Sequence, residues 1–332
     1  MTDAAGSVTI HHGDNLVVTS GFADASFTLI YLDPPFNTGR VQGKAVESAR
    51  SGLHAGGSRT GAAADTTPTQ AEKAPDAPKS VSGTGSAATS LNTVGALPAA
   101  VVRRGFHGLE YERVRGALRS YDDKFDDYWG FLEPRLIEAW RLLSPEGTLY
   151  LHLDYREAHY AKVMLDAIFG RDHFLNELIW SYDYGAKTRK RWPSKHDTIL
   201  VYVKDPARYH FDSEGVDREP YMAPGLVTPE KAARGKLPTD VWWHTIVPTT
   251  GREKTGYPTQ KPEGILRRIV QASSRPGDRV LDAFAGSGTT GAVASALGRD
   301  AVLIDQNADA IEVMVKRMPG ATVIHSPAVR QA

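Results

Sequence analysis

The chain of 332 residues contains no cysteine. This absence excludes structural disulfides, cysteine-ligated zinc or iron-sulfur sites, and any mechanism that needs a thiolate nucleophile. Apolar residues make up 41% of the chain, which is enough for a hydrophobic core. No apolar run approaches the roughly 18 residues that a membrane helix needs. The N-terminal stretch MTDAAGSVTIHHGD also lacks a basic region followed by an apolar one, so we expect a cytoplasmic protein with no membrane partner.

An excess of charge of either sign is missing as well. The 39 lysine and arginine residues balance the 39 aspartate and glutamate residues, so the formal net charge is zero. Because no overall field attracts a polyanion, any contact with nucleic acid must come from local patches.

Aromatic residues are absent from one long segment. Of the 60 residues in 41–100, 40 are Ala, Gly, Ser, Thr or Pro, and none is Phe, Tyr or Trp. Such a segment buries too little apolar surface to offset its chain entropy. The composition therefore predicts a disordered insertion over 41–115, with order resuming near 116–121.

Elsewhere, strand and helix patterns alternate along the chain. Apolar runs predict strands at 8–10, 27–32, 148–153, 177–182, 198–203, 279–283 and 301–305. Apolar residues spaced by three and four predict helices at 128–143, 156–169, 264–273, 289–297 and 307–318. This alternation predicts an α/β fold with a mostly parallel sheet covered by helices. Residues 204–258 show no clean period.

Polar residues follow two of the predicted strands. "LDPPFNTG" (32–39) places Asp33, two prolines and Phe36 directly after an apolar run, and Asp14 follows the first strand. Proline cannot extend a sheet ladder, and in open α/β sheets ligands bind outside the carboxyl ends of the strands. The pattern therefore indicates a binding edge.

A glycine turn lies near the other end of the chain. In "VLDAFAGSGTTG" (280–291), a strand leads through Gly286 and Gly288 into a helix, and no lysine completes a phosphate-binding loop. Asp305 follows about twenty residues later, where an acidic side chain accepts hydrogen bonds from ribose hydroxyls. The alternative role for Asp305 is a helix N-cap. A ribose-binding site without a phosphate-binding loop favours S-adenosylmethionine over NAD as the ligand.

Three motifs together carry a family resemblance. "LDPPF", "GYPTQKP" (256–262) and "DAFAGSGTTG", in this order, resemble the permuted β group of amino-methylating DNA methyltransferases. The likeness covers 8–35, 121–204 and 240–317. It implies a circularly permuted, doubly wound, Rossmann-like fold. Residues 1–40 and 116–204 would form the catalytic half, 205–255 an irregular target-recognition segment, 256–325 the cofactor half and 326–332 a tail. Ala283 stands where the family usually has proline.

The resemblance also implies roles for individual residues. In the catalytic motif, the Asp33 carboxylate and the Pro34 carbonyl would accept the two N–H bonds of the target amino group, with Pro35 stiffening the loop and Phe36 stacking on the flipped base. The implied S-adenosylmethionine site comprises Asp14, Thr259, Lys261, Asp282, Phe284, Ala285, Gly286, Ser287, Gly288, Thr289 and Asp305, with Thr259 and Lys261 near the cofactor carboxylate. The basic run Arg189, Lys190, Arg191 and Lys195 suits DNA phosphates. No metal is implied, because His11 and His12 have no ligand partner at a suitable spacing.

The type of target follows partly from the missing cysteine. Methylating cytosine at ring carbon needs a cysteine nucleophile, so only amino-group methylation is possible. Asp at the first motif position favours adenine N6 over cytosine N4, which stays the alternative, as does an inactive DNA-binding relative. RNA and protein-glutamine enzymes usually carry Asn there and have the unpermuted order. Expected partners are double-stranded DNA and a cognate restriction endonuclease, with the chain a monomer or a homodimer.

Overall fold

The computed structural model of the chain describes residues 5–37, 40–51, 102–104, 110–123, 125, 127–185 and 187–326. The chain divides into two compact units, Met1–Ala45 with Leu118–Ala332, and Val46–Ala117. The predicted lack of structure in 52–101 lies outside the described residues. No helix in the described ranges has both the length and the apolar character needed to cross a bilayer.

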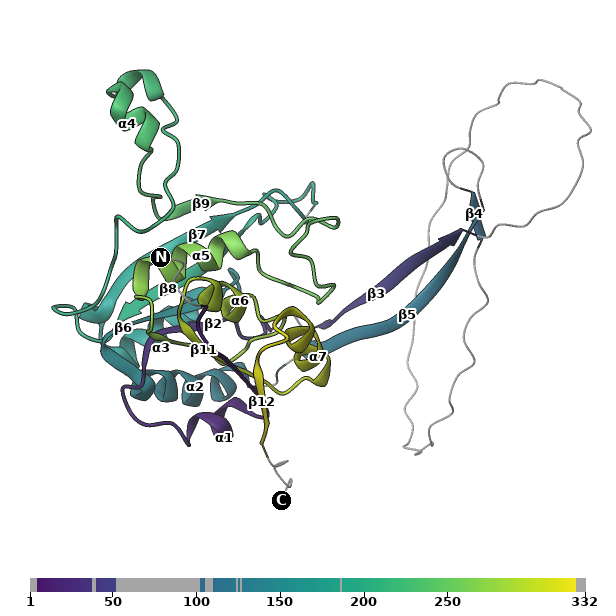
Figure 1. The fold of residues 1–332 in the computed structure, drawn as a ribbon, viewed down its shortest axis with the longest axis horizontal. Helices are drawn as coiled ribbons and strands as arrows, with labels where there is room; N and C mark the ends of the chain where they lie inside the picture. The colour runs from purple at the N-terminus through teal and green to yellow at the C-terminus, as the bar shows by residue number, and fades with distance from the viewer. Residues whose placement is uncertain are drawn as a thin grey trace, which may run out of the picture. The chain divides into compact units, whose positions relative to one another are not determined.

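The larger unit is built on a nine-stranded sheet in the order β12-β1-β11-β10-β2-β6-β8-β7-β9 (Figure 1). Its strands are β1 (Val8–His12), β2 (Phe27–Leu32), β6 (Leu143–Leu153), β7 (Phe174–Ser181), β8 (His196–Val203), β9 (Val241–Trp243), β10 (Arg279–Asp282), β11 (Asp300–Asp305) and β12 (Thr322–His325). All neighbouring strands pair in parallel except those that pair with β8. The predicted mostly parallel sheet is therefore confirmed.

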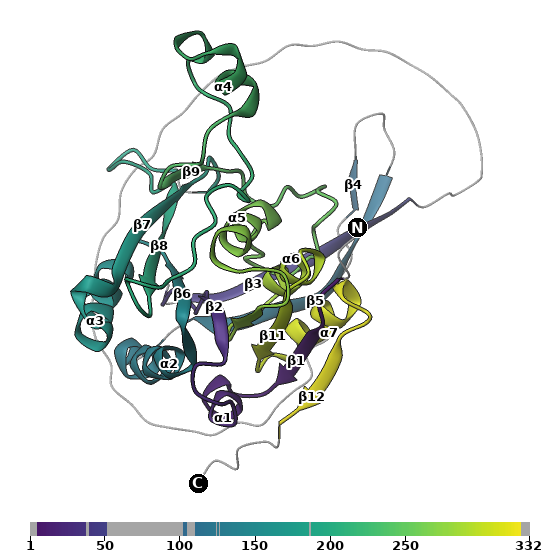
Figure 2. The same cartoon turned by 60° about the vertical axis from the view of Figure 1, so that its left-hand side comes forward.

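Helices cover both faces of this sheet. They are α1 (Asn15–Thr19), α2 (Tyr128–Leu142), α3 (Ala158–Phe169), α5 (Glu263–Ser273), α6 (Thr289–Ala296) and α7 (Ala308–Arg317). The short helix α4 (Pro229–Arg234) lies away from the sheet (Figure 1). Leu29 and Tyr31 of β2 point into one core with α5, α6 and α7, whereas Ile30 and Leu32 point into a second core with α1, α2 and α3 (Figure 2). The alternation of side chains along a strand thus gives the doubly wound arrangement.

A separate three-stranded sheet has the order β3-β5-β4, with β3 at Arg40–Ser51, β4 at Val102–Arg104 and β5 at Glu110–Asp123. These strands occupy both ends of the segment that the composition predicted to be disordered, so that prediction does not hold at 41–51, 102–104 and 110–115. Strand pairing satisfies backbone groups even where few side chains are apolar, and composition averaged over a long window does not show this.

The pairing of strands shows the circular permutation. N-terminal β1 lies beside C-terminal β11, with His12 opposite Asp305, and β10 lies beside β2, with Asp282 opposite Tyr31. The carboxyl ends of β1, β11, β10 and β2 therefore lie side by side, along the edge of the sheet that the ends of its strands form. Segments from both ends of the chain meet there.

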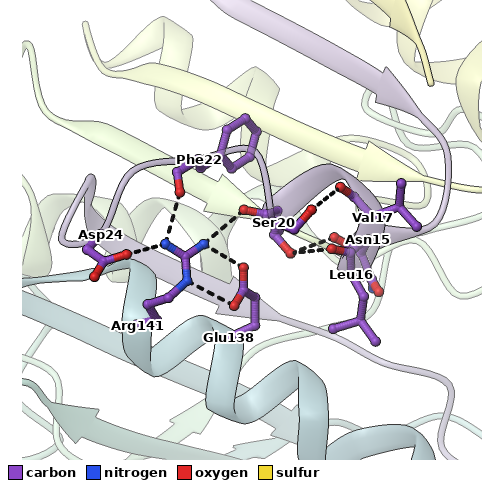
Figure 3. A network of polar contacts seen from close by, with 9 residues as sticks. Asn15, Leu16, Val17, Ser20, Phe22, Asp24, Glu138 and Arg141 are labelled. Atoms are coloured by element: carbon purple, nitrogen blue, oxygen red, sulfur yellow. Dashed lines mark hydrogen bonds and ion pairs between the residues drawn. The ribbon is translucent and has the colours of Figure 1, made fainter. Parts of the chain in front are cut away.

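Sequence patterns did not predict the short helix α1. Hydrogen bonds from Arg141 of α2 connect the two helices (Figure 3). The guanidinium donates to the Thr19 and Phe22 carbonyls at 3.0 and 2.9 Å, to both oxygens of Glu138 and to Asp24. A five-residue helix has too few hydrogen bonds to be stable alone, so this contact holds it in place. The turn between β1 and α1 is fixed with it.

Candidate active site

A cavity of about 450 Å³ opens at the carboxyl edge of the sheet. Its volume is within the usual range for small-molecule sites. Every predicted catalytic residue and every predicted cofactor residue except Gly288 lines it. The catalytic motif and the glycine turn, at opposite ends of the sequence, therefore share one cavity.

The catalytic motif begins where β2 ends. Lys261 Nζ lies 2.8 Å from Asp33 Oδ1, and both side chains are largely buried. The same ammonium lies 4.6 Å from the centre of the Phe36 ring. The sequence assigned Lys261 to the cofactor carboxylate and did not indicate its contact with Asp33. This ion pair holds one carboxylate oxygen in a fixed orientation.

The residue after the motif anchors the loop. Asn37 has φ of 52°, in the left-handed region that costs a non-glycine residue energy. Its Nδ2 donates to Glu157 Oε1 at 3.0 Å, and its Oδ1 accepts from the Phe125 N–H at 3.3 Å. These contacts fix the backbone on the downstream side of the motif.

The glycine turn needs glycine at both positions. Gly286 and Gly288 have φ of 49° and 70°. A Cβ on Gly288 would lie 2.7 Å from Met314 Cγ, and one on Gly286 would lie 3.2 Å from the Tyr257 ring. The turn brings the backbone to the cavity wall and starts α6 at Thr289.

Asp305, at the end of β11, stabilises this turn through hydrogen bonds. Its Oδ2 accepts from the Gly286 N–H and its Oδ1 from the Asn307 N–H, both at 2.8 Å. Burial raises the pKa of this carboxyl. The N-cap of α7 is Asn307, not Asp305, so the simple capping role is excluded. The carboxylate lines the cavity instead.

Asp282 is the most perturbed acid of the site. It is buried at the end of β10 and accepts from Thr290 Oγ1 at 2.6 Å and from the Phe284 N–H at 3.0 Å. Burial raises its pKa to about 7, and the neighbouring charges of Asp33 and Asp305 add to this effect against the lowering by its hydrogen bonds. Asp282 therefore titrates near neutral pH.

Arg135 of α2 supports the other end of the cavity. Its Nη2 lies 3.2 Å from Asp14 Oδ2, and its Nε donates to Asn15 Oδ1 at 2.8 Å. Asn15 in turn donates to the Ala283 carbonyl at 3.0 Å, which ties the β1 turn to the glycine turn. Neither Arg135 nor Asn15 was predicted from the sequence. Arg135 lies between the apolar positions of an amphipathic helix, where a solvated arginine is expected, so no sequence signal marks it.

The predicted basic run lies in the loop between β7 and β8. Arg189, Lys190 and Arg191 are exposed, and Lys195 Nζ lies 3.3 Å from Asp183 Oδ1. Because β8 is antiparallel to β6, with Thr198 opposite Leu153, this loop is on the same edge of the sheet as Asp33. Within the described part of the chain, no three His, Asp or Glu side chains gather as metal ligands.

The charges that line the cavity do not balance. Four acidic side chains, those of Asp14, Asp33, Asp282 and Asp305, line the cavity with only two cationic side chains. The cations are Lys261 and Arg135. They pair with Asp33 and Asp14, respectively, so the excess lies with Asp282 and Asp305, whose pKa values are raised by burial. Such an excess favours a ligand that carries positive charge.

Known proteins are similar to this chain in sequence and in fold. The N6_N4_Mtase family, described as DNA methylase, matches residues 27–316. Type II methyltransferase M.HpaI of Haemophilus parainfluenzae is 32% identical over 194 residues, which cover 58% of this chain and 60% of that protein. DNA adenine methyltransferase YhdJ of Escherichia coli (strain K12) is 33% identical over 207 residues, which cover 60% of this chain and 69% of that protein.

A solved structure supports the fold independently. The crystal structure of the M1.HpyAVI-SAM complex superposes with a TM-score of 0.52 at 17% identity, covering 94% of this chain and 98% of that one. At this identity the likeness concerns the fold alone. Because the family match spans most of the sequence and its motifs converge on one cavity of the expected fold, the chain belongs to the N6_N4_Mtase family of DNA methylases.

Proposed function

We propose that this protein transfers a methyl group from S-adenosylmethionine to the exocyclic N6 of a flipped adenine in double-stranded DNA. The observation that carries the proposal is the shared cavity, in which Asp33 and Pro34 face the same space as the glycine turn and Asp305. A nucleoside cofactor and a planar amino-bearing base need these two half-sites side by side.

The residues present fit S-adenosylmethionine. Asp305, at the end of the strand next to the glycine turn, suits the two ribose hydroxyls. The excess of carboxylates suits the sulfonium cation. Thr259 and Lys261 line the cavity where the methionine carboxylate would lie, as the family resemblance implies. When bound, the cofactor supplies an electrophilic methyl group on a positively charged sulfur.

The protein's own part is to make the amino group nucleophilic. The N6 lone pair of adenine is delocalised into the ring, and acceptors aimed at its two N–H bonds localise it on nitrogen. Asp33 and the Pro34 carbonyl are those acceptors, and the fixed φ of proline limits the entropy lost in aligning the carbonyl. Asp33 would stabilise the positive charge that develops on N6 and would accept its proton.

DNA would approach from the same edge of the sheet. The exposed cations Arg189, Lys190 and Arg191 suit phosphate contacts beside the cavity. The predicted target-recognition segment 205–255 contains α4, which lies away from the sheet in both views (Figures 1 and 2). Met222, Leu226 and Trp243 are strongly exposed in this segment. We propose that this segment reads the DNA sequence.

The product nucleoside tests the proposal. Purified protein is incubated with S-adenosylmethionine carrying a tritiated methyl group and with genomic DNA from a methylation-free host. The DNA is then digested to nucleosides and analysed by mass spectrometry. The expected product is N6-methyldeoxyadenosine. N4-methyldeoxycytidine as the product, or no methylated nucleoside, would contradict the proposal.

Cofactor affinity should depend on pH through Asp282. With a pKa of about 7, this carboxyl is protonated below pH 7 and anionic above it. A cationic ligand therefore binds more tightly as the pH rises, and we expect S-adenosylmethionine affinity to increase by about tenfold, or about 1.4 kcal/mol, from pH 6 to 8. Equilibrium binding by calorimetry measures this change.

S-adenosylhomocysteine provides the control, because it has the same amino group but no sulfonium charge. Its affinity should rise much less over the same pH range, and Asp282→Asn should make the two ligands respond alike. If the affinities of both ligands change equally with pH in the wild type, the charge of Asp282 does not interact with the sulfonium.

Removing the partner of Asp33 should slow turnover. We expect Lys261→Met to lower kcat by about tenfold or more, because Asp33 then loses the contact that orients it. Lys261→Arg should recover part of the rate. Steady-state methylation assays measure the effect, with Lys316→Met, at an exposed position of α7, as the matched control. Wild-type kcat in Lys261→Met would rule out this role.

A further inference from the structure

A chain of buried polar side chains lies at the catalytic edge of the sheet. The Tyr31 hydroxyl is 2.7 Å from His152 Nδ1, and His152 Nε2 is 3.2 Å from Asp197 Oδ2. The Tyr182 hydroxyl donates to Asp197 Oδ1 at 2.9 Å. These residues come from β2, β6, β8 and the end of β7. His152 is fully buried, and neither composition nor motif predicted this cluster.

Both ring nitrogens of His152 take part in this chain. Burial, with the charges of Asp33, Asp282 and Asp197, raises the pKa of Tyr31 well above 10, so its hydroxyl stays protonated beside Nδ1. Nε2 lies against the Asp197 carboxylate. Burial acts to raise the pKa of Asp197, but His152, Lys261 and Tyr182 together hold it below its usual value.

His152 is therefore held at both ring nitrogens. An imidazole with both nitrogens in hydrogen bonds cannot rotate without breaking them. A leucine would fill similar space without any such orientation, and it would leave the buried Tyr31 hydroxyl and Asp197 carboxylate without this partner. The cluster thus defines one orientation of the His152 ring.

The oriented ring contacts the catalytic loop. The centres of the His152 and Phe36 rings are 5.9 Å apart, with their planes inclined by 33°. The Lys261 ammonium also lies against Phe36, 4.6 Å from the centre of its ring. His152 itself packs edge-on against Trp180, with ring centres 5.6 Å apart. The position of Phe36 is thus set by side chains that are themselves fixed.

We propose that His152, held by Tyr31 and Asp197, is a positioning residue that sets the orientation of the Phe36 ring against the flipped base. The inference rests on the proposed function, in which Phe36 stacks on the target adenine. Phe36 and Tyr31 are among the described residues that line the cavity, whereas His152 is not. We therefore expect the effect of His152 to pass through its ring contact with Phe36.

A double-mutant cycle tests this route. Tyr31→Phe removes one hydroxyl and leaves the ring, and His152→Leu removes the imidazole that joins Tyr31 to Asp197. Each is measured in the wild type and in Phe36→Ala, as single-turnover methylation of genomic DNA from a methylation-free host. Tyr150→Phe is the matched control, since Tyr150 is a buried tyrosine of β6 whose hydroxyl is 2.7 Å from Ser273 Oγ of α5.

We expect Tyr31→Phe to slow methyl transfer by about tenfold in the wild type, but by less than about twofold in Phe36→Ala, because the two substitutions remove the same contribution. The affinity of Tyr31→Phe for S-adenosylmethionine and its melting temperature should stay near those of the wild type. Tyr150→Phe should not change the rate of methyl transfer in either background. His152→Leu should show the same non-additivity with a larger effect.

Equal slowing by Tyr31→Phe in both backgrounds, or none in either, would overturn the inference. A loss of cofactor affinity in proportion to the rate would also overturn it, because that indicates a general structural role. Failure of the proposed function is distinguishable: in that case the wild type itself would leave no N6-methyladenine in the DNA.

Discussion

Replacing Asp33 by Ala should lower the rate of methyl transfer by about a thousandfold or more, while S-adenosylmethionine still binds with near wild-type affinity. Asp33 is the acceptor that localises the N6 lone pair and stabilises the charge developing there. It lies on the catalytic loop, whereas Asp305 and the glycine turn form the cofactor half of the cavity. We therefore expect the substitution to lower the rate of methyl transfer without weakening cofactor binding.

Asp33→Asn makes the test sharper. The amide keeps an oxygen acceptor but loses the negative charge and the ion pair with Lys261, so we expect a rate between those of wild type and Asp33→Ala. Asp172→Ala, an exposed carboxylate after α3, is the control and should behave as wild type. Single-turnover rates and calorimetric binding measure both quantities. An Asp33→Ala variant that retains a tenth of the rate would exclude Asp33 as the principal acceptor.

Replacing Asp305 by Ala should weaken S-adenosylmethionine binding by about a hundredfold or more. Two hydrogen bonds from ribose hydroxyls to a part-buried carboxylate are charge-assisted, and each contributes about 1.5–3 kcal/mol. The same change removes the acceptor of the Gly286 N–H, which loosens the glycine turn. Asp305→Asn keeps an acceptor for that N–H and should lose less affinity.

A cofactor analogue separates the ribose contact from loosening of the turn. The 2′-deoxy form of S-adenosylhomocysteine should bind the wild type more weakly than the parent compound does. Asp305→Ala should not distinguish the two, because the group that reads the hydroxyl is gone. If Asp305→Ala discriminates between them as well as wild type does, Asp305 does not contact the ribose.

The elements with strong patterns could be predicted from sequence. Short runs of mostly apolar residues form β2, β10 and β11, as in buried parallel strands, and the acids at their carboxyl ends mark the binding edge. That Asp33 and Gly286 line one cavity followed only from the family's permuted motif order. Periodicity does not say which strands are neighbours.

The supporting residues could not be predicted in the same way. Arg135 acts only because the fold brings Asp14 and Asn15 to it from far along the chain. His152 did leave a signal, a lone polar residue within the apolar run TLYLHL, but its partners Tyr31 and Asp197 are set by strand order. The strands β3 and β5 were missed because their residues have no marked apolar alternation.

Genome-wide mapping of modified bases tests the central claim most directly. Wild type and Asp33→Ala are expressed separately in a methylation-free host, and every modified base is located by sequencing. We expect N6-methyladenine at one defined sequence motif with the wild type, and none with Asp33→Ala at equal protein levels. Wild-type cells without N6-methyladenine at a defined motif, or the same pattern of modification in Asp33→Ala cells, would contradict the claim.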